Sequence, residues 1–221
     1  MKGERLPAKV LSARIIPNAS AELCKALKLK KHYSSLALLS ADSDDVTYIA
    51  LDEATKAASV EVVYGKSLYA GAANASTSLA GEVIGILGGS TPGEVKSGLE
   101  AALAHIQTVS FRSANDRNDV MYLAHCIARS GSYLSGVAKV PIGYPLAYLI
   151  APPVEAVVGL DAALKAAAVE PAVFFLPPTE TNFGGALLTG TLSACKAACE
   201  AFAEAVCDLA SNPKGEWYGI G

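Results

Sequence analysis

Charged side chains are scarce in this sequence, and neither sign dominates. Asp, Glu, Lys and Arg together make up 18% of the 221 residues, and the formal net charge is −3. A surface that binds nucleic acid needs clustered basic side chains to neutralise phosphates, so this balance argues against a nucleic-acid partner. Hydrophobic residues reach 52%. That share is high for a soluble monomer and indicates that other copies of the chain cover much of its surface.

A long apolar run is also missing. No stretch of about 18 or more uncharged apolar residues is present, which argues against a membrane span. The opening MKGERLPAKVLSARIIP has no continuous apolar segment, so we expect no secretory signal. The five cysteines are odd in number and irregularly spaced, which is typical of a protein of the reducing cytoplasm. A chain of this length needs no disulfides, because it can bury one large core or two small ones.

The sequence repeats itself. Three pairs of segments match in the same order: DEATKAASVE (52–61) with DAALKAAAVE (161–170), SLALLSA (35–41) with PLAYLIA (145–151), and VKSGLEA (95–101) with CKAACEA (195–201). The first pair is identical at seven of its ten positions. We therefore interpret the chain as a tandem duplication, with one domain at 1–112 and a second at 113–221.

Each half predicts the same α+β succession, in which a strand, a short Ala-rich helix, two more strands and a long amphipathic helix follow one another. The expected strands are 35–41, 60–71 and 81–89 in the first half and 145–151, 170–178 and 185–190 in the second. The expected helices are 54–59, 92–107, 163–168 and 191–210. In the first long helix, Val95, Leu99, Leu103 and Ile106 form a single apolar stripe. Segment 115–130 opens with Asn and Asp residues that suit a helix start, and we predict one more helix there.

Motifs of catalysis and metal binding are absent. The sequence has no P-loop, dinucleotide fingerprint, nucleophile elbow or HExxH motif, so we expect no catalytic residues, no enzyme activity and no cofactor. Cys195 and Cys199 are four residues apart, but they align with Val95 and Leu99 of the apolar stripe and are interpreted as small buried hydrophobic residues. His125 and the cysteine after it point about 100° apart on the predicted helix, which favours packing over a metal site. We predict no metal.

Three acids, Asp42, Asp44 and Asp45, lie between two apolar segments in SADSDDVTYI (40–49). The segment lacks the Gly and the bidentate Glu of an EF-hand calcium loop. From the residues alone, the simplest interpretation is a solvated or capping turn whose carboxylates bond nearby backbone amides. The second half has APPVEAVVGL at the corresponding place, with Glu155 as its single acid. Halves that agree elsewhere but differ here indicate a function at this segment.

Several long segments resemble one known family. SLALLSADSDDVTYIALDEATK, GSYLSG, AYLIAPPVEA, PPTETNFGGALLTG and ACKAACEAF resemble the L-type shell proteins of ethanolamine-utilisation bacterial microcompartments, over about residues 10 to 210. The resemblance implies an α+β fold of two tandem, circularly permuted bacterial microcompartment (BMC) domains. It also implies a homotrimer that forms a pseudohexamer, lateral contacts with other shell proteins, and a place in the shell of a microcompartment in the cytoplasm, with neither membrane nor nucleic acid as a partner.

The resemblance further implies small acidic pores that bind ethanolamine. An ammonium ion that leaves water needs carboxylates and hydrogen-bond acceptors around it, and an aromatic ring can add a cation–π contact. Matched residue by residue, the site consists of Asp44, Asp45, Glu82, Phe111, Glu155, Thr181, Asn182 and Phe183.

Two segments, 67–78 and 176–185, occupy equivalent places in the two halves and are rich in small residues and Pro. Ordinary surface loops are the alternative interpretation. The resemblance implies that they gate a central pore, with Tyr69, Gly71, Asn74, Pro178, Glu180 and Gly184 as gate residues. Because 181–183 belongs both to this gate and to the ethanolamine site, we expect bound ethanolamine to favour the closed pore.

The main functional prediction is a structural, selectively permeable shell protein, whose work is done by pore shape and polar lining. A soluble regulatory protein that binds small amines outside any shell is the alternative. An enzyme that uses the acid cluster is less favoured, because no base or nucleophile accompanies the acids.

Overall fold

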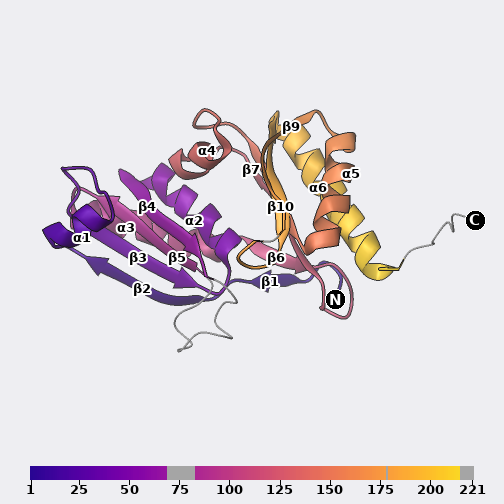
Figure 1. Cartoon of the computed structure of the whole chain (residues 1–221), viewed down its shortest axis with the longest axis horizontal. Helices are drawn as coiled ribbons and strands as arrows, with labels where there is room; N and C mark the ends of the chain where they lie inside the picture. Colours follow the sequence, from indigo (N-terminus) through magenta and orange to yellow (C-terminus); the bar gives the residue numbers. More distant parts are fainter. Residues whose placement is uncertain (69–82, 178, 215–221) are drawn as a thin grey trace, which may run out of the picture. The chain divides into compact units, whose positions relative to one another are not determined.

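A computed structural model describes residues 1–68, 83–177 and 179–214, which fold into two compact units (Figure 1). Of the described residues, unit 1 contains 1–6, 111–128, 144–177 and 179–214, and unit 2 contains 7–68, 83–110 and 129–143. Neither unit is continuous in sequence. The division into 1–112 and 113–221 refers to the duplicated halves of the sequence and stays a prediction.

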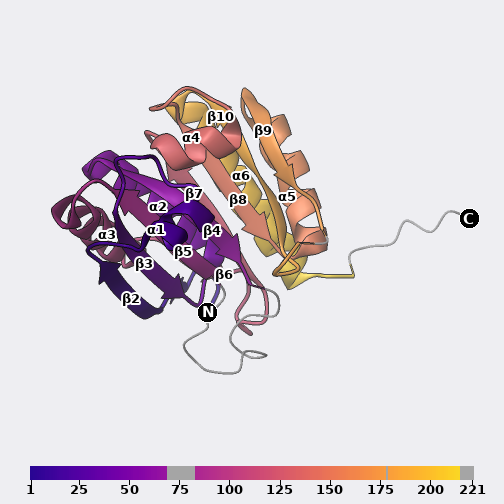
Figure 2. The ribbon, with the colours of Figure 1, turned by 60° about the vertical axis from the view of Figure 1, so that its left-hand side comes forward.

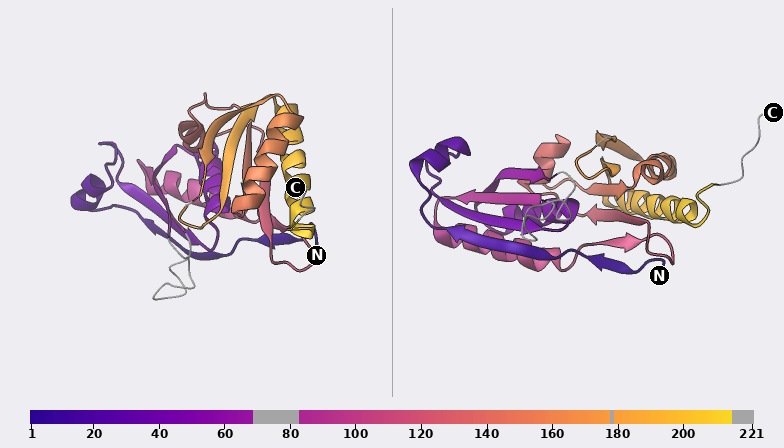
Figure 3. Two further views of the ribbon diagram at one scale, coloured as in Figure 1. Left: turned by 45° about the vertical axis from the view of Figure 1, so that its right-hand side comes forward. Right: turned by 60° about the horizontal axis from the view of Figure 1, so that its bottom comes forward.

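Unit 2 is built on a four-stranded antiparallel sheet with the strand order β2-β3-β5-β4. Its elements are β2 (Val10–Ile16), α1 (Ala21–Ala26), β3 (Ser35–Ala41), α2 (Asp44–Ala57), β4 (Val60–Ser67), β5 (Val83–Gly89), α3 (Pro92–Ile106) and α4 (Ser132–Ala138). Helices α2 and α3 pack against each other and against the sheet, as the right-hand view of Figure 3 shows for α3. The predicted apolar stripe of α3 packs as expected, since Val95 and Ile106 are fully buried. Thr91 and Glu94 form a capping box that fixes the start of this helix.

Unit 1 is built on a six-stranded sheet with the order β1-β6-β7-β8-β10-β9. Its elements are β1 (Arg5–Pro7), β6 (Ser110–Ser113), β7 (Met121–Ile127), β8 (Leu146–Ala151), α5 (Pro153–Ala166), β9 (Val169–Phe175), β10 (Gly184–Gly190) and α6 (Leu192–Ser211). Helices α5 and α6 lie side by side on one face of this sheet (Figure 2). Phe202 of α6 is fully buried and fills the space that Gly159 leaves on α5, where a Cβ atom would come within 2.7 Å of the Phe202 ring.

The same succession of elements occurs twice in the described chain. It reads β1-β2-α1-β3-α2-β4-β5-α3 and then β6-β7-α4-β8-α5-β9-β10-α6. The strand order also recurs, as β2-β3-β5-β4 and as β7-β8-β10-β9. Even a local irregularity is shared, because the register shifts between Val62 and Tyr64 in β4 and between Pro171 and Val173 in β9. A bulge at corresponding positions supports a duplication of the whole fold.

The predicted helix at 115–130 is wrong. Met121–Ile127 is a strand that pairs antiparallel with β8. The Asn and Asp residues before it close the turn between β6 and β7: the Asn115 side-chain amide donates to Asp119 at 2.6 Å, and the Ala114 backbone N–H donates to the Val120 carbonyl at 2.8 Å. The supposed helix start is thus a hairpin turn.

The two short Ala-rich helices exist, but they are longer than expected, since α2 begins at Asp44 and α5 at Pro153. Cys195 and Cys199 are buried on α6, as predicted. No helix in the described ranges is both long and apolar enough to cross a membrane.

Candidate ligand site

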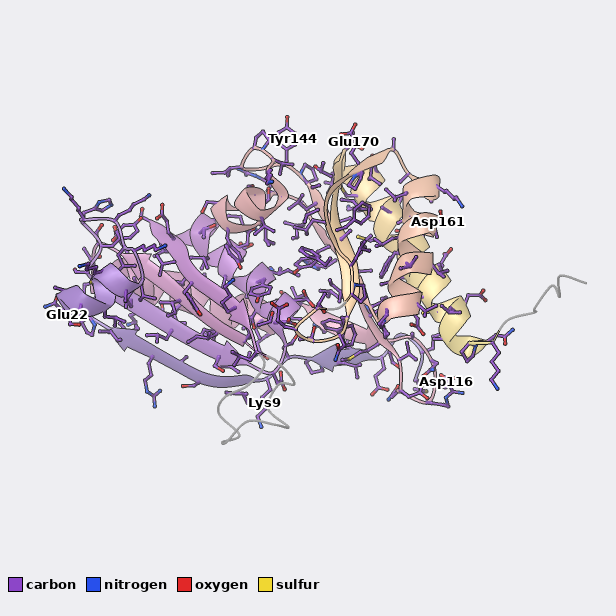
Figure 4. The ribbon with its side chains drawn as sticks, viewed as in Figure 1. Lys9, Glu22, Asp116, Tyr144, Asp161 and Glu170 are labelled. Carbon is purple, nitrogen blue, oxygen red and sulfur yellow. The ribbon has the colours of Figure 1, made fainter. Side chains whose placement is uncertain are left out.

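The acidic stretch is the junction between β3 and α2, and its three acids differ in environment. Asp42 is exposed, and its carboxylate accepts a hydrogen bond at 2.6 Å from the backbone N–H of Lys9, a residue labelled in Figure 4. Asp44 and Asp45 lie in the first turn of α2, and each is only 8% exposed. The stretch is therefore not one solvated turn: one acid ties down backbone, and two are buried at a helix start.

Asp44 is held by both of its carboxylate oxygens. One accepts the backbone N–H of Asp45 at 2.9 Å, and the other accepts the hydroxyl of Ser67 at 2.8 Å. The first turn of a helix also favours negative charge, because the backbone N–H groups there point toward it. The two hydrogen bonds fix the position of the Asp44 carboxylate at the helix start.

The hydrogen-bond chain continues from Ser67 to Tyr48. The two hydroxyl oxygens are 2.7 Å apart. Because the Ser67 proton is donated to Asp44, Tyr48 donates its own proton to Ser67. Burial raises the pKa of Tyr48 far above its usual value, so the phenol keeps that proton at neutral pH. Burial and the nearby Asp52 raise the pKa of Tyr133, whose ring centroid lies 6.0 Å from that of Tyr48, to about 12.

Ser43 precedes α2 and leaves a polar atom unsatisfied. Its hydroxyl is buried and has no hydrogen-bond partner within the described part of the chain, and it does not cap the helix. Its carbonyl is engaged, since it accepts the Thr47 hydroxyl at 2.6 Å. A buried hydroxyl without a partner costs about 1–3 kcal/mol, which a bound polar group could recover.

Unit 1 brings two of the predicted aromatic residues together. The rings of Phe111 and Phe183 meet edge to face with centroids 5.9 Å apart. Phe183 ends a tight turn in which Asn182 adopts a left-handed conformation (φ 60°). The turn is closed by the Thr179 hydroxyl, which donates to the Phe183 carbonyl at 2.7 Å, and by the Asn182 N–H, which donates to the Thr179 carbonyl at 3.2 Å.

The other predicted residues are placed as follows. Thr181 is half-buried, Asn182 and Glu180 are exposed, and Gly184 is buried as the first residue of β10. Glu155 is half-buried in the first turn of α5. Five of the predicted residues lie outside the described residues: Tyr69, Gly71, Asn74, Pro178 and Glu82. Unit 2 thus brings Asp44 and Asp45 together, unit 1 brings Phe111 and Phe183 together, and the pocket that they would share stays a prediction.

The cysteines and histidines add no metal centre to this picture. Within the described ranges, no group of three or more His, Cys, Asp or Glu residues is arranged to hold a metal ion. Burial raises the pKa of Cys195 to about 11 and raises the pKa of Cys199 as well, so both remain protonated thiols at neutral pH. His125 lies on strand β7 and not on a helix.

The predicted ethanolamine site did not include Ser43, Tyr48 or Ser67, and Ser67 was expected only as the first residue of the gate segment 67–78. Ser67 is 23 residues from Asp44 in the chain, so only the fold brings them together. The repeat contained a signal, because the aligned positions in the second half are the apolar residues Val157 and Leu176 in place of Tyr48 and Ser67.

Comparison with known proteins identifies the family. Residues 35–114 match the BMC domain. The bacterial microcompartment shell protein EutL of Clostridium perfringens (strain 13 / Type A) is 62% identical over 97% of this chain and 100% of its own length. EutL of Escherichia coli (strain K12) is 55% identical over 92% of this chain and 94% of its own length.

A solved structure agrees over the whole fold. The crystal structure of the ethanolamine utilization protein EutL from Leptotrichia buccalis C-1013-b superposes with a TM-score of 0.96, at 60% identity, over 98% of this chain and 100% of that one. The predicted α+β fold of BMC domains is confirmed. The chain therefore belongs to the EutL family of bacterial microcompartment shell proteins, and it is a structural component of a microcompartment shell and not an enzyme.

Proposed function

We propose that three copies of this chain form a flat, pseudohexameric tile of an ethanolamine-utilisation microcompartment, with small acidic pores that bind and pass ethanolamine. Two similar halves per chain, closed by threefold symmetry, give six similar modules around one axis. The Leptotrichia buccalis relative is an ethanolamine utilization protein, which supports this substrate. Other shell proteins would contact the tile laterally. Membership of a shell-protein family argues against the alternative of a soluble amine-binding regulator.

The observation that carries the amine site is the buried pair Asp44 and Asp45. Two adjacent carboxylates at 8% exposure are costly unless hydrogen bonds or a cation compensate them. Neutral donors reach both oxygens of Asp44, but they bring no positive charge. A primary ammonium would add a positive charge and three N–H donors beside these carboxylates.

Ser43 suits the other end of an amino alcohol. Its buried hydroxyl has no partner among the described residues, and it stands next to Asp44 in the sequence. Ethanolamine carries a hydroxyl two carbons from its ammonium and offers both a charge for the acids and a partner for Ser43. Glu82, Phe111, Glu155 and residues 181–183 would complete the wall of the site.

Segments 67–78 and 176–185 would gate a central pore on the threefold axis. Thr181, Asn182 and Phe183 belong to the second of these segments and to the proposed site, so ligand binding would bias the gate toward the closed state. Crystals grown with saturating ethanolamine should show closed pores. Mostly open pores under those conditions would contradict this coupling.

Isothermal titration with ethanolamine tests the amine site. We expect Asp45→Ala and Asp44→Ala to weaken binding at least about tenfold. Asp42→Ala is the matched control, because this acid lies in the same stretch but is exposed and bonded to the Lys9 backbone; its affinity should equal that of the wild type. Ethylene glycol, which lacks the charge, should not bind. An affinity equal to that of the wild type in all three variants would refute the site.

A further inference from the structure

We propose that Tyr48 and Ser67 are positioning residues of the amine site, which act through Asp44 and hold its carboxylate in the orientation that receives a small primary ammonium. This inference rests on the proposed function. It adds two residues that the predicted ethanolamine site does not contain, of which Ser67 is also the first residue of the predicted gate segment 67–78, and states how they work.

The first step is geometry within unit 2. Asp44 lies in the first turn of α2, Tyr48 lies one turn further along the same helix, and Ser67 is the last residue of β4. The bonds of 2.7 Å and 2.8 Å join them in one line, from the phenol to the serine hydroxyl to the carboxylate. Each bond polarises the next toward the negative charge, so the chain is stronger than two isolated bonds.

The second step is what this chain does for a ligand. An aspartate at a helix start can adopt several rotamers. A ligand that binds only one of them has a lower affinity, because binding must then immobilise the side chain. Here the Ser67 hydroxyl and the Asp45 N–H each engage one oxygen of Asp44. The carboxylate is therefore oriented before any ligand arrives.

The third step shows that the fold itself does not require these three polar residues. In the second half, Pro153 and Val157 of α5 stand at the positions of Asp44 and Tyr48, and Leu176, directly after β9, stands at the position of Ser67. The second half therefore lacks all three polar groups of the hydrogen-bond chain. Val157 and Leu176 are 54% and 60% exposed, so they form no buried contact in its place.

Gly65 leaves space for the tyrosines beside the hydrogen-bond chain. A Cβ atom on Gly65 would lie 2.8 Å from the Tyr133 hydroxyl and 3.6 Å from the Tyr48 ring. The aligned residue in the second half is Phe174, which is exposed. The space for two tyrosines beside α2 thus accompanies the polar chain and is absent where the chain is absent.

Titration of the full-length protein with ethanolamine tests the inference. Ser67→Ala should weaken binding about tenfold, since a hydrogen bond to a charged group is lost, and Tyr48→Phe should weaken it several-fold. In the Ser67→Ala background, Tyr48→Phe should have no further effect, because Tyr48 acts only through Ser67. Ser67→Thr, which restores the hydroxyl, should restore binding. Tyr133→Phe is the control, since it removes the hydroxyl of a neighbouring tyrosine that has no part in the hydrogen-bond chain from Tyr48 to Asp44.

The outcomes separate this inference from the proposed function. If Asp44→Ala abolishes binding while Ser67→Ala and Tyr48→Phe bind like the wild type, the positioning role is wrong and the amine site stands. If the wild type binds no ethanolamine, both fall. Additive losses in the double variant, or a failure of Ser67→Thr to restore affinity at an unchanged thermal midpoint, would also overturn the positioning role.

Discussion

The carboxylate of Asp52 on α2 accepts a hydrogen bond at 2.6 Å from the backbone N–H of Gly131, at the start of α4. Its second oxygen accepts the N–H of Leu134 at 2.8 Å. Gly131 is the N-cap residue of α4 and has no side chain with which to satisfy these donors. Helices α1, α3 and α6 are capped by their own N-cap side chains, whereas the cap of α4 comes from another helix, across 79 residues of chain.

Removing this carboxylate should destabilise unit 2. Asp52 is 1% exposed, and Asp52→Ala leaves two buried N–H donors of α4 without a partner. We expect the free energy of unfolding to fall by about 2–3 kcal/mol, as measured by urea denaturation. The matched control is Asp161→Ala, the aligned residue of the second half. Asp161 lies on the outer side of α5 (Figure 4) and pairs with Lys165 in solvent, so its loss should change stability by less than about 0.5 kcal/mol. Equal effects would contradict the capping role.

The same carboxyl should give stability a pH dependence of known sign. Burial raises the pKa of Asp52, although the hydrogen bonds from Gly131 and Leu134 and the charge of Lys56 oppose the rise. A carboxyl with a higher pKa in the folded chain binds its proton more tightly there. Its titration therefore adds stability that is fully present below the unfolded pKa of about 3.9 and is lost as pH rises through the folded pKa.

Asp52→Asn does not titrate at this position and isolates the effect. We expect the free energy of unfolding of the wild type, relative to Asp52→Asn, to decrease as the pH rises above about 3.9. Urea denaturation of both proteins at several pH values measures the difference. A difference that stays constant, or that increases with pH, would show that the pKa of Asp52 is not raised.

Two glycines of the α4 region should respond in opposite ways to alanine. A Cβ on Gly131 would lie 2.5 Å from the backbone oxygen of Asp52, whereas a Cβ on Gly136 would meet nothing within 4 Å. Gly131→Ala should cost about 1–3 kcal/mol through overpacking. Gly136→Ala, inside the helix, should stabilise the protein by about 0.5–1 kcal/mol. Thermal unfolding of the two variants checks this. A destabilised Gly136→Ala together with an unaffected Gly131→Ala would refute the packing of α4 against α2.

Repeats and periodicity predicted much of the fold. The strand at 35–41 and the long helices near 92–107 and 191–210 lie where the sequence placed them. The prediction for segment 115–130 was wrong because Asn and Asp occur in hairpin turns as well as at helix starts. In addition, β7 has only seven residues, and the spacing of apolar residues over so short a segment does not distinguish a strand from a helix. Helix α2 began earlier than expected because Val46, Thr47 and Ile49 favour strands, and their burial overrides that preference.

The candidate site was predicted only in part. The contrast between the two halves pointed to the acidic segment as a whole, and the family resemblance selected Asp44 and Asp45, which are buried. Nothing in the local sequence distinguished Asp42 from the other two acids. Only its hydrogen bond with Lys9 shows that it is a turn residue. Ser67 joins Asp44 only through the packing of β4 beside α2, a relation that spacing along the chain does not contain.

A crystal structure of the wild-type protein with saturating ethanolamine tests the central claim most directly. We predict ligand density at the start of α2, with the ammonium nitrogen within about 3.2 Å of a carboxylate oxygen of Asp44 or Asp45. Density for ethanolamine elsewhere, with water alone beside these two aspartates, would contradict the account.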